Sequence, residues 1–229
     1  MNMRLPDLIT LYTETEKRAF TGAEGGFNDV RYTLTETAEG LEVCVSADET
    51  PLTYLRLRWH FGITEKRCEP LRIYGDAWER GVPERCMPWF CLVSNGTDAY
   101  GQREGRKTDG FGVKVRPGAL CFWQYDASGV TLWMDIRNGG SGVLLQGRTL
   151  HAATVIFRTY EACTAFEAGQ QFCHAMCQDP LTTPQPVYGS NNWYYAYGVS
   201  SQAEILRDTG IVARLCQGNE NRPFMVIDD

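Results

Sequence analysis

Apolar and polar residues alternate along most of the first 160 positions of this 229-residue chain. In residues 54–61, Leu57 and Trp59 fall on one face of an extended segment, while Arg56 and Arg58 fall on the other. Comparable patterns predict further strands over residues 30–37, 41–47, 111–116, 119–125, 130–137 and 152–160. A period of two gives each strand one buried face and one more solvent-exposed face, which is typical of antiparallel sheets. We therefore expect a mainly β fold, with an antiparallel β-sandwich over these 160 residues.

The period changes to that of a helix beyond the last of these strands. Apolar or small residues, Phe166 among them, recur at three- and four-residue steps over residues 162–177. This spacing predicts one helix with a single apolar face, which ends before Pro180 because a proline disfavours helical backbone in the preceding residue. Two prolines in residues 181–186 then indicate a linker. We assign residues 1–180 to a β-sandwich domain with a C-terminal helix.

Residues 187–229 predict one strand–helix–strand unit. A short strand leads into a loop rich in glycine, asparagine and aromatic residues, and a helix follows the capping-box spacing of Ser201 and Glu204. The last strand, 224–227, is continuously apolar, which is typical of a parallel strand covered on both faces. One such unit cannot supply that cover. We therefore expect a fragment that stops inside a second domain and is aggregation-prone or a partner-dependent homo-oligomer. The alternative is a C-terminal edge strand with a frayed, charged tail.

Composition narrows the class of protein. A net charge of −6 disfavours a nucleic-acid-binding surface, which would need a basic face. The N-terminal residues lack the apolar region of a secretory signal, and no stretch approaches the length of a membrane span. The nine cysteines are scattered without a CxxC pair, so we expect reduced thiols rather than disulfides. The resulting expectation is a cytoplasmic protein without a cofactor, a bound metal or a membrane partner.

The strongest candidates for chemistry are the acidic pair Asp228 and Asp229 and six residues of the loop after the first strand: Asn191, Asn192, Trp193, Tyr194, Tyr195 and Tyr197. In a parallel layout, the loop after the first strand and the end of the second strand open on the same edge of the sheet. Carboxylates and amides there can hydrogen-bond several hydroxyls, and aromatic rings offer a flat apolar platform. This pattern indicates a polyhydroxylated ligand. The alternative is that the aromatic residues belong to the core and the asparagines cap a turn.

Two other segments carry candidate residues. Residues 74–81 place Asp76 and Trp78 between glycines, which suits a loop that contacts a polar ligand, although spacing alone favours an ordinary surface loop. Cys173 and Cys177 share one face of the predicted helix, where they would supply at most half of a zinc site. We interpret both cysteines as part of the buried apolar stripe of that helix.

Three C-terminal stretches, VYGSNNWYYAYG, SSQAEILRDTG and RPFMVIDD, resemble the start of the catalytic barrel of melibiase-type α-galactosidases, in glycoside hydrolase clan D and closest to family 36. The upstream pieces YGDAWERG, LCFWQYDASGVTLWMDIRNGG and FCHAMC are similar to the sandwich and linker that precede that barrel. The resemblance covers most of residues 54–229 and is strongest over residues 187–229. It implies a supersandwich, a short helix and linker, and the first βαβ unit of an incomplete (β/α)8 barrel.

The resemblance also implies an activity, the removal of terminal α-galactosyl residues by a retaining two-carboxylate mechanism. The residues that it places at the substrate, in this chain or in a neighbouring subunit, are Asp228, Asp229, Trp193, Asn192, Tyr195, Asp76 and Trp78. The nucleophile and the acid/base come from later barrel strands in that family, so we expect the 229-residue chain to be inactive. Two alternatives stay open: a galactosyltransferase of the same clan, and a non-catalytic carbohydrate-binding β-sandwich.

Overall fold

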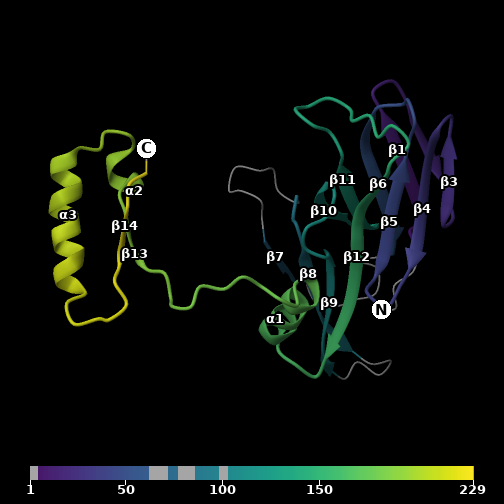
Figure 1. Ribbon diagram of the computed structural model, residues 1–229. Helices are drawn as coiled ribbons and strands as arrows, with labels where there is room; N and C mark the ends of the chain where they lie inside the picture. The colour runs from purple at the N-terminus through teal and green to yellow at the C-terminus, as the bar shows by residue number, and fades with distance from the viewer. Residues whose placement is uncertain (1–4, 62–71, 77–85, 98–102, 229) are drawn as a thin grey trace. The chain divides into compact units, whose positions relative to one another are not determined.

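The chain divides into two compact units, Met1–Asp179 (the first unit) and Pro180–Asp229 (the second unit). The structure is a computed structural model that describes residues 5–61, 72–76, 86–97 and 103–228, with the backbone alone at 95–97 and 103–106. Strands predominate among the described residues, and the predicted mainly β fold is confirmed (Figure 1).

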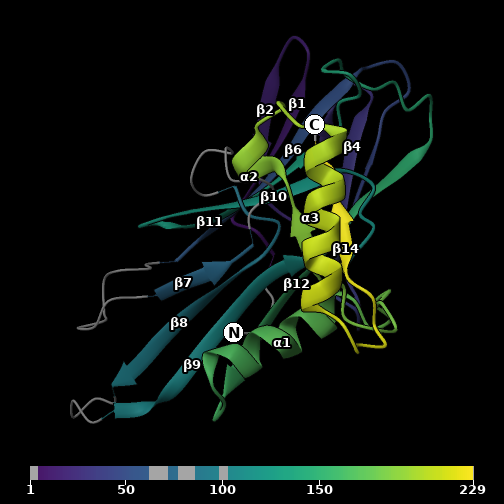
Figure 2. The ribbon, with the colours of Figure 1, turned by 90° about the vertical axis from the view of Figure 1, so that its left-hand side faces the viewer.

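Two antiparallel sheets make up the first unit (Figures 1 and 2). One has the order β10-β11-β6-β1-β2, with β1 (Leu8–Thr13), β2 (Lys17–Phe20), β6 (Leu52–His60), β10 (Leu120–Asp126) and β11 (Gly129–Asp135). The other has the order β3-β4-β5-β12-β9-β8-β7, with β3 (Glu24–Phe27), β4 (Val30–Glu36), β5 (Leu41–Ser46), β7 (Arg72–Gly75), β8 (Phe90–Thr97), β9 (Arg103–Val113) and β12 (Thr149–Glu161). This arrangement is consistent with a β-sandwich.

Residues from both sheets share one buried apolar cluster. Leu55, Leu57 and Trp59 of β6 are at most 1% exposed, as the alternation predicts. The Trp59 ring meets the Phe157 ring of β12 edge-on, with centroids 5.0 Å apart, and so joins the two sheets. Burial of each such side chain stabilises the fold by about 1.5–3 kcal/mol, so this cluster dominates the stability of the first unit.

The helix α1 (Ala165–Met176) packs against β9 and β12 of the seven-stranded sheet. It begins at a capping box, in which the Thr164 hydroxyl accepts from the Glu167 N–H and the Glu167 carboxylate accepts from the Thr164 N–H. Phe172 is fully buried over Gly110 of β9, where an added Cβ would lie 2.7 Å from its ring. A glycine on the strand is therefore what lets the helix lie close to the sheet.

The structure corrects the sequence analysis at three apolar positions. Phe166 is 72% exposed, and Cys173, predicted to be buried, is exposed as well. The buried face of α1 is narrower than predicted and consists of Ala168, Gly169, Phe172 and Met176. The strand predicted over residues 111–116 ends at Val113, which leaves Val115 51% exposed in the link to β10.

The second unit contains a two-stranded parallel sheet. Strand β13 (Gly189–Asn191) pairs with β14 (Phe224–Val226), which confirms the predicted parallel pairing. The short helix α2 (Trp193–Ala196) follows β13, and α3 (Gln202–Leu215) connects it to β14 (Figure 1). No other strand occurs among the residues described in this unit, so a barrel is still only an expectation.

The second unit has almost no buried side chains. Within its described part, only Asn192 is buried. Val187, Phe224, Val226 and Ile227 are 48–67% exposed, in agreement with the expectation that the unit cannot cover its own strands. None of the helices that the structure describes combines the length and the apolar character that a membrane span requires.

Candidate functional site

The carboxyl ends of β13 and β14 bring Asn191, Asn192 and Asp228 together. The side-chain N–H of Asn191 donates to Asp228 Oδ2 at 3.0 Å, and the backbone N–H of Asp228 donates to Asn192 Oδ1 at 2.8 Å. The parallel register, with Asn191 opposite Val226, places both strand ends at the same level. This is the edge at which parallel α/β sheets gather their ligand-binding groups.

Asn192 positions the end of β14. Its side chain is fully buried, and Nδ2 donates to Ser200 Oγ at 2.9 Å while Oδ1 accepts from the Asp228 backbone. Both ends of the amide are thus used inside the protein. Asn192, expected at the substrate, instead fixes the backbone from which the Asp228 carboxylate projects.

Asn191 links that carboxylate to the helix α2. Its Oδ1 accepts from the Trp193 N–H at 2.7 Å, while its Nδ2 holds Asp228 Oδ2. The other carboxylate oxygen, Oδ1 of Asp228, has no hydrogen-bond partner among the described residues. Asn191 is exposed and Asp228 half-buried, so this free oxygen lies at an edge open to solvent. Asn191 is one of the loop residues that the sequence singled out, and the structure brings it into contact with Asp228.

The aromatic residues of α2 face two different environments. Trp193 is 37% exposed, and its ring centroid lies 5.7 Å from that of Tyr197. The Tyr195 hydroxyl instead donates to the Asp208 carboxylate on α3. This bond raises the pKa of Tyr195 and holds the pKa of Asp208 below its usual value. The Trp193 backbone is therefore linked to the Asp228 edge through Asn191, whereas the Tyr195 side chain is bonded to α3.

Of the other expected substrate residues, the structure describes only Asp76. Asp76 directly follows β7 in the first unit and is exposed. Burial raises the pKa of Cys173 on α1, and the Asp76 charge adds to that shift, which places Asp76 near this helix. Trp78 and Asp229 lie outside the described residues.

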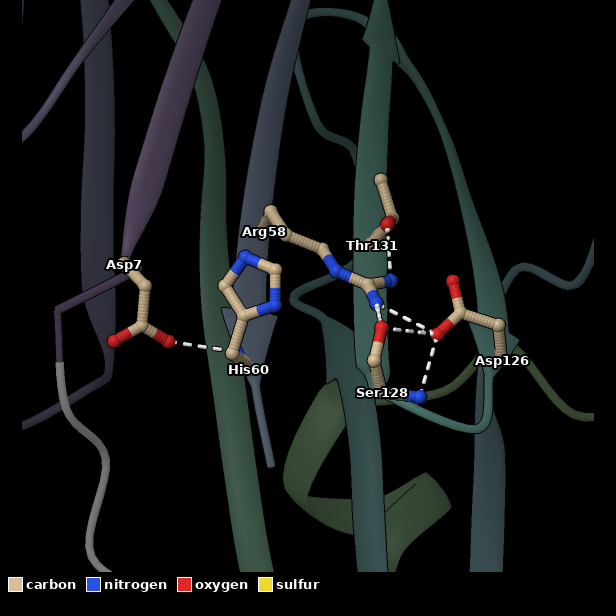
Figure 3. Close-up of polar contacts among 6 residues, drawn as sticks. All are labelled: Asp7, Arg58, His60, Asp126, Ser128 and Thr131. Atoms are coloured by element: carbon tan, nitrogen blue, oxygen red, sulfur yellow. Dashed lines mark hydrogen bonds and ion pairs between the residues drawn. The ribbon is translucent and has the colours of Figure 1, made fainter. Parts of the chain in front are cut away.

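A second polar cluster surrounds Arg58 on the outward face of the five-stranded sheet (Figure 3). Arg58 is only 8% exposed, and it donates to Thr131 Oγ1, Asp126 Oδ1 and Ser128 Oγ. The guanidinium holds the pKa of Asp126 well below its usual range. Because Ser128 also donates to Asp126, its hydroxyl is committed both as donor and as acceptor. The cluster satisfies a buried cation and anchors the turn between β10 and β11.

Asp7 and His60, drawn beside that cluster in Figure 3, are joined through the backbone: the His60 N–H donates to Asp7 Oδ2 at 2.6 Å. This bond fixes the entry to β1 against the end of β6. Nowhere in the part of the chain that the structure describes do three or more His, Cys, Asp or Glu side chains gather as a metal site would require. Comparisons with protein-family models, with curated proteins and with solved structures gave no match to this chain.

Proposed function

We propose that the edge formed by Asn191, Trp193 and Asp228 binds a galactosyl unit of an α-galactoside, as part of the sugar pocket of an α-galactosidase-like glycoside hydrolase. The observation that carries this proposal is the hydrogen bond from Asn191 to Asp228 across the carboxyl ends of two parallel strands. The resemblance of residues 187–229 to the start of a melibiase-type barrel supplies the class of sugar.

The chemistry of the edge suits neighbouring hydroxyls. With Oδ2 held by Asn191, the free Oδ1 of Asp228 keeps a fixed direction in which it can accept a charge-assisted hydrogen bond from a sugar hydroxyl. The partly exposed Trp193 offers an apolar surface to the C–H face of the ring. Hydroxyl binding is therefore the role assigned to Asp228, and Trp193 is assigned the aromatic wall.

The same proposal treats β13, α3 and β14 as the first unit of a (β/α)8 barrel. It is supported by the exposed apolar residues of β14, Phe224 and Val226, which neighbouring strands and helices of a barrel would cover. A retaining glycosidase needs two catalytic carboxylates about 5–5.5 Å apart. No described residue is assigned to that pair, so we expect the 229-residue chain to bind galactosides without hydrolysing a chromogenic α-galactoside.

A ligand titration of the 229-residue chain tests the binding role. We expect methyl α-galactoside to bind more tightly than methyl α-glucoside, and Asp228→Asn to weaken the galactoside about tenfold through loss of a charge-assisted bond. Glu220→Gln removes the same charge from an exposed residue of the same unit and serves as the control. Unchanged affinity of the Asp228 variant, or no preference for the galactoside, would refute the assignment.

A second candidate function, carbohydrate binding by the sandwich itself, rests on the outward face of the five-stranded sheet. The rings of Tyr12, Tyr54 and Trp133 cluster there with centroids 5.6–6.1 Å apart. Arg56 lies over the Trp133 ring. If this face is the sugar site, Trp133→Ala abolishes galactoside binding and Asp228→Asn leaves it intact, whereas the first proposal requires the reverse.

A further inference from the structure

A cavity of about 460 Å³ lies in the first unit, beside the last turn of α1. Its walls come from Pro88 and Trp89 before β8, from the link between β9 and β10, and from Met176 of α1. The volume falls within the range of about 300–1,000 Å³ that is typical of small-molecule sites. None of the residues at the Asp228 edge contributes to it, so it is a separate feature of the molecule.

The backbone of the cavity is fixed on two sides. In the link between β9 and β10, the Val115 N–H donates to the Met176 carbonyl at 3.1 Å, and the Gly118 N–H donates to the Ala152 carbonyl of β12 at 3.0 Å. These bonds hold the link between the helix and the seven-stranded sheet. The cavity is therefore preformed in the folded unit.

The lining is mostly apolar, and part of it faces solvent. Val115 and Leu120 are 51% and 52% exposed. Trp89 forms another wall, and its ring packs against that of Phe172, with centroids 6.4 Å apart. Exposed apolar side chains around a concave, preformed site favour an apolar ligand body.

The charges at the cavity have one sign. Its lining contains two cations, Lys114 and Arg116, and no carboxylate. Lys114 is paired with Glu39, with 2.6 Å between Nζ and Oε2. The Arg116 guanidinium has neither a hydrogen bond nor an ion pair with any described residue, although its backbone is held in the left-handed region at φ 60°. One uncommitted cation therefore remains for a ligand.

Three cysteines contribute to the lining, Cys121, Cys173 and Cys177, and the first two are held in the neutral thiol form. Burial raises the pKa of Cys121 to about 12, and burial also raises the pKa of Cys173. Thiolates, which bind metals and attack electrophiles, are thereby disfavoured. In the described part of the chain these thiols form no metal-binding group with other side chains.

We propose that this cavity binds a small amphiphilic anion, with its apolar body against Trp89, Val115 and Leu120 and its carboxylate paired with Arg116. A sugar fits less well, because the lining offers few hydrogen-bonding side chains. A cationic amphiphile would meet the unpaired charge of Arg116, and the lining has no carboxylate to compensate it. The site is independent of the galactoside edge proposed above.

Octanoate is the probe for the 229-residue chain, with octanol and octyltrimethylammonium as neutral and cationic comparators of the same chain length. In a calorimetric titration we expect octanoate to bind most tightly and the cation not to bind. Arg116→Gln should weaken octanoate about tenfold and leave octanol unchanged, because only the anion uses the guanidinium. Arg18→Gln removes the same charge on β2, at the opposite edge of the five-stranded sheet from β10, and should change neither.

Leu120→Ser, at an exposed position, should weaken octanoate and octanol alike, while the far-ultraviolet circular dichroism of the chain stays native. Three outcomes overturn the proposal: no saturable octanoate binding by the folded chain, equal binding of all three probes, or an unchanged octanoate affinity in Arg116→Gln. The proposal would also be overturned if the chain bound no octanoate but formed a dimer that Leu120→Ser dissociates. In that case the cavity would be a contact site for a second copy of the chain.

Discussion

The two units of this chain are stabilised by different physical effects. In the first unit, large side chains such as Trp59 and Trp123 are at most 1% exposed within a core shared by two sheets. In the second unit, Asn192 is the sole buried residue of the described part, while Tyr197 and Ile227 are 64% and 67% exposed. Burial of apolar side chains stabilises the first unit, whereas hydrogen bonds and helix caps stabilise the second.

This difference sets how firmly each unit holds its shape. A hydrogen bond contributes only about 0.5–1.5 kcal/mol net, because the unfolded chain bonds to water. The parallel pairing in the second unit spans three residue pairs, from Gly189 with Phe224 to Asn191 with Val226. Without apolar cover, such a sheet gains little beyond those bonds. The candidate sugar-binding edge is therefore built on the less stable of the two units.

Substitution of one apolar side chain in each unit gives the largest expected contrast. Trp59→Ala should lower the free energy of unfolding by about 3–5 kcal/mol, because it empties a site between Trp123 and Phe157. Phe224→Ala, at a position 57% exposed, should change it by less than about 0.5 kcal/mol. Urea unfolding followed by circular dichroism measures both. Similar losses from the two variants would mean that β14 is covered in solution.

Removal of the buried amide tests what holds the second unit together. Asn192→Ala deletes the bonds to Ser200 and to the Asp228 N–H, at a cost of about 1–3 kcal/mol. Amide exchange in β14 should become roughly ten- to hundredfold faster, with the first unit unaffected. Gln217→Ala, at an exposed position of the same unit, is the control. Unaltered exchange in β14 would show that this amide does not anchor the strand.

Most of the strands that the sequence predicted are apolar on at least one face. In β4 and β5 the burial alternates residue by residue, so the strand is readable from residue order alone, whereas β12 buries Ala152 to Phe157 in succession because α1 covers its second face. The strands β1, β2, β3, β7 and β8 were missed. β1 and β8 lie inside their sheets, whereas β2, β3 and β7 are edge strands, which need only backbone pairing with one neighbour. β2, for example, has no buried residue and takes its conformation from β1. Such strands leave no period in the sequence.

The candidate site was predictable to the extent that backbone topology fixes it. Parallel pairing requires the end of β14 to lie beside the residue after β13, so the meeting of Asp228 with Asn192 could be expected. The different roles of Asn192, Trp193 and Tyr195 could not be predicted. They depend on α2, whose left-handed end at Tyr197 (φ 46°) and whose Tyr195–Asp208 bond are side-chain and turn details without a periodic signal.

The Arg58 cluster provides a pH test confined to the first unit. Asp126→Ala leaves the nearly buried Arg58 guanidinium without its carboxylate, so we expect the free energy of unfolding to fall by about 1–2 kcal/mol. The loss is small for a nearly buried cation because the Asp126 side chain is 55% exposed and solvent screens the pair. The pKa of Asp126 is depressed in the folded state, so its contribution is present above the ordinary value of about 3.9 and is lost as the pH falls through the folded pKa.

The urea midpoints of the parent chain and Asp126→Ala should therefore converge as the pH is lowered from neutral to about 3 and below. Asp179→Ala, which removes an exposed carboxylate, is the control and should leave the midpoint nearly unchanged at every pH. A gap between parent and Asp126→Ala that stays constant down to the lowest pH would show that the ion pair is not its source.

The smallest expected effects come from two glycines of the second unit, and they differ in sign. An alanine Cβ at Gly210, inside α3, would meet only Arg214 Nη1 at 3.7 Å, so Gly210→Ala should stabilise the helix by about 0.5–1 kcal/mol. Gly218 has open space around it but a φ of +89°, so Gly218→Ala should cost about 1 kcal/mol. Amide exchange in α3 reports both changes. Neither position is crowded, so a change of stability in the same direction for both variants would mean that side-chain contacts, rather than backbone conformation, determine the stability of α3. That result would contradict the contrast drawn between the two units.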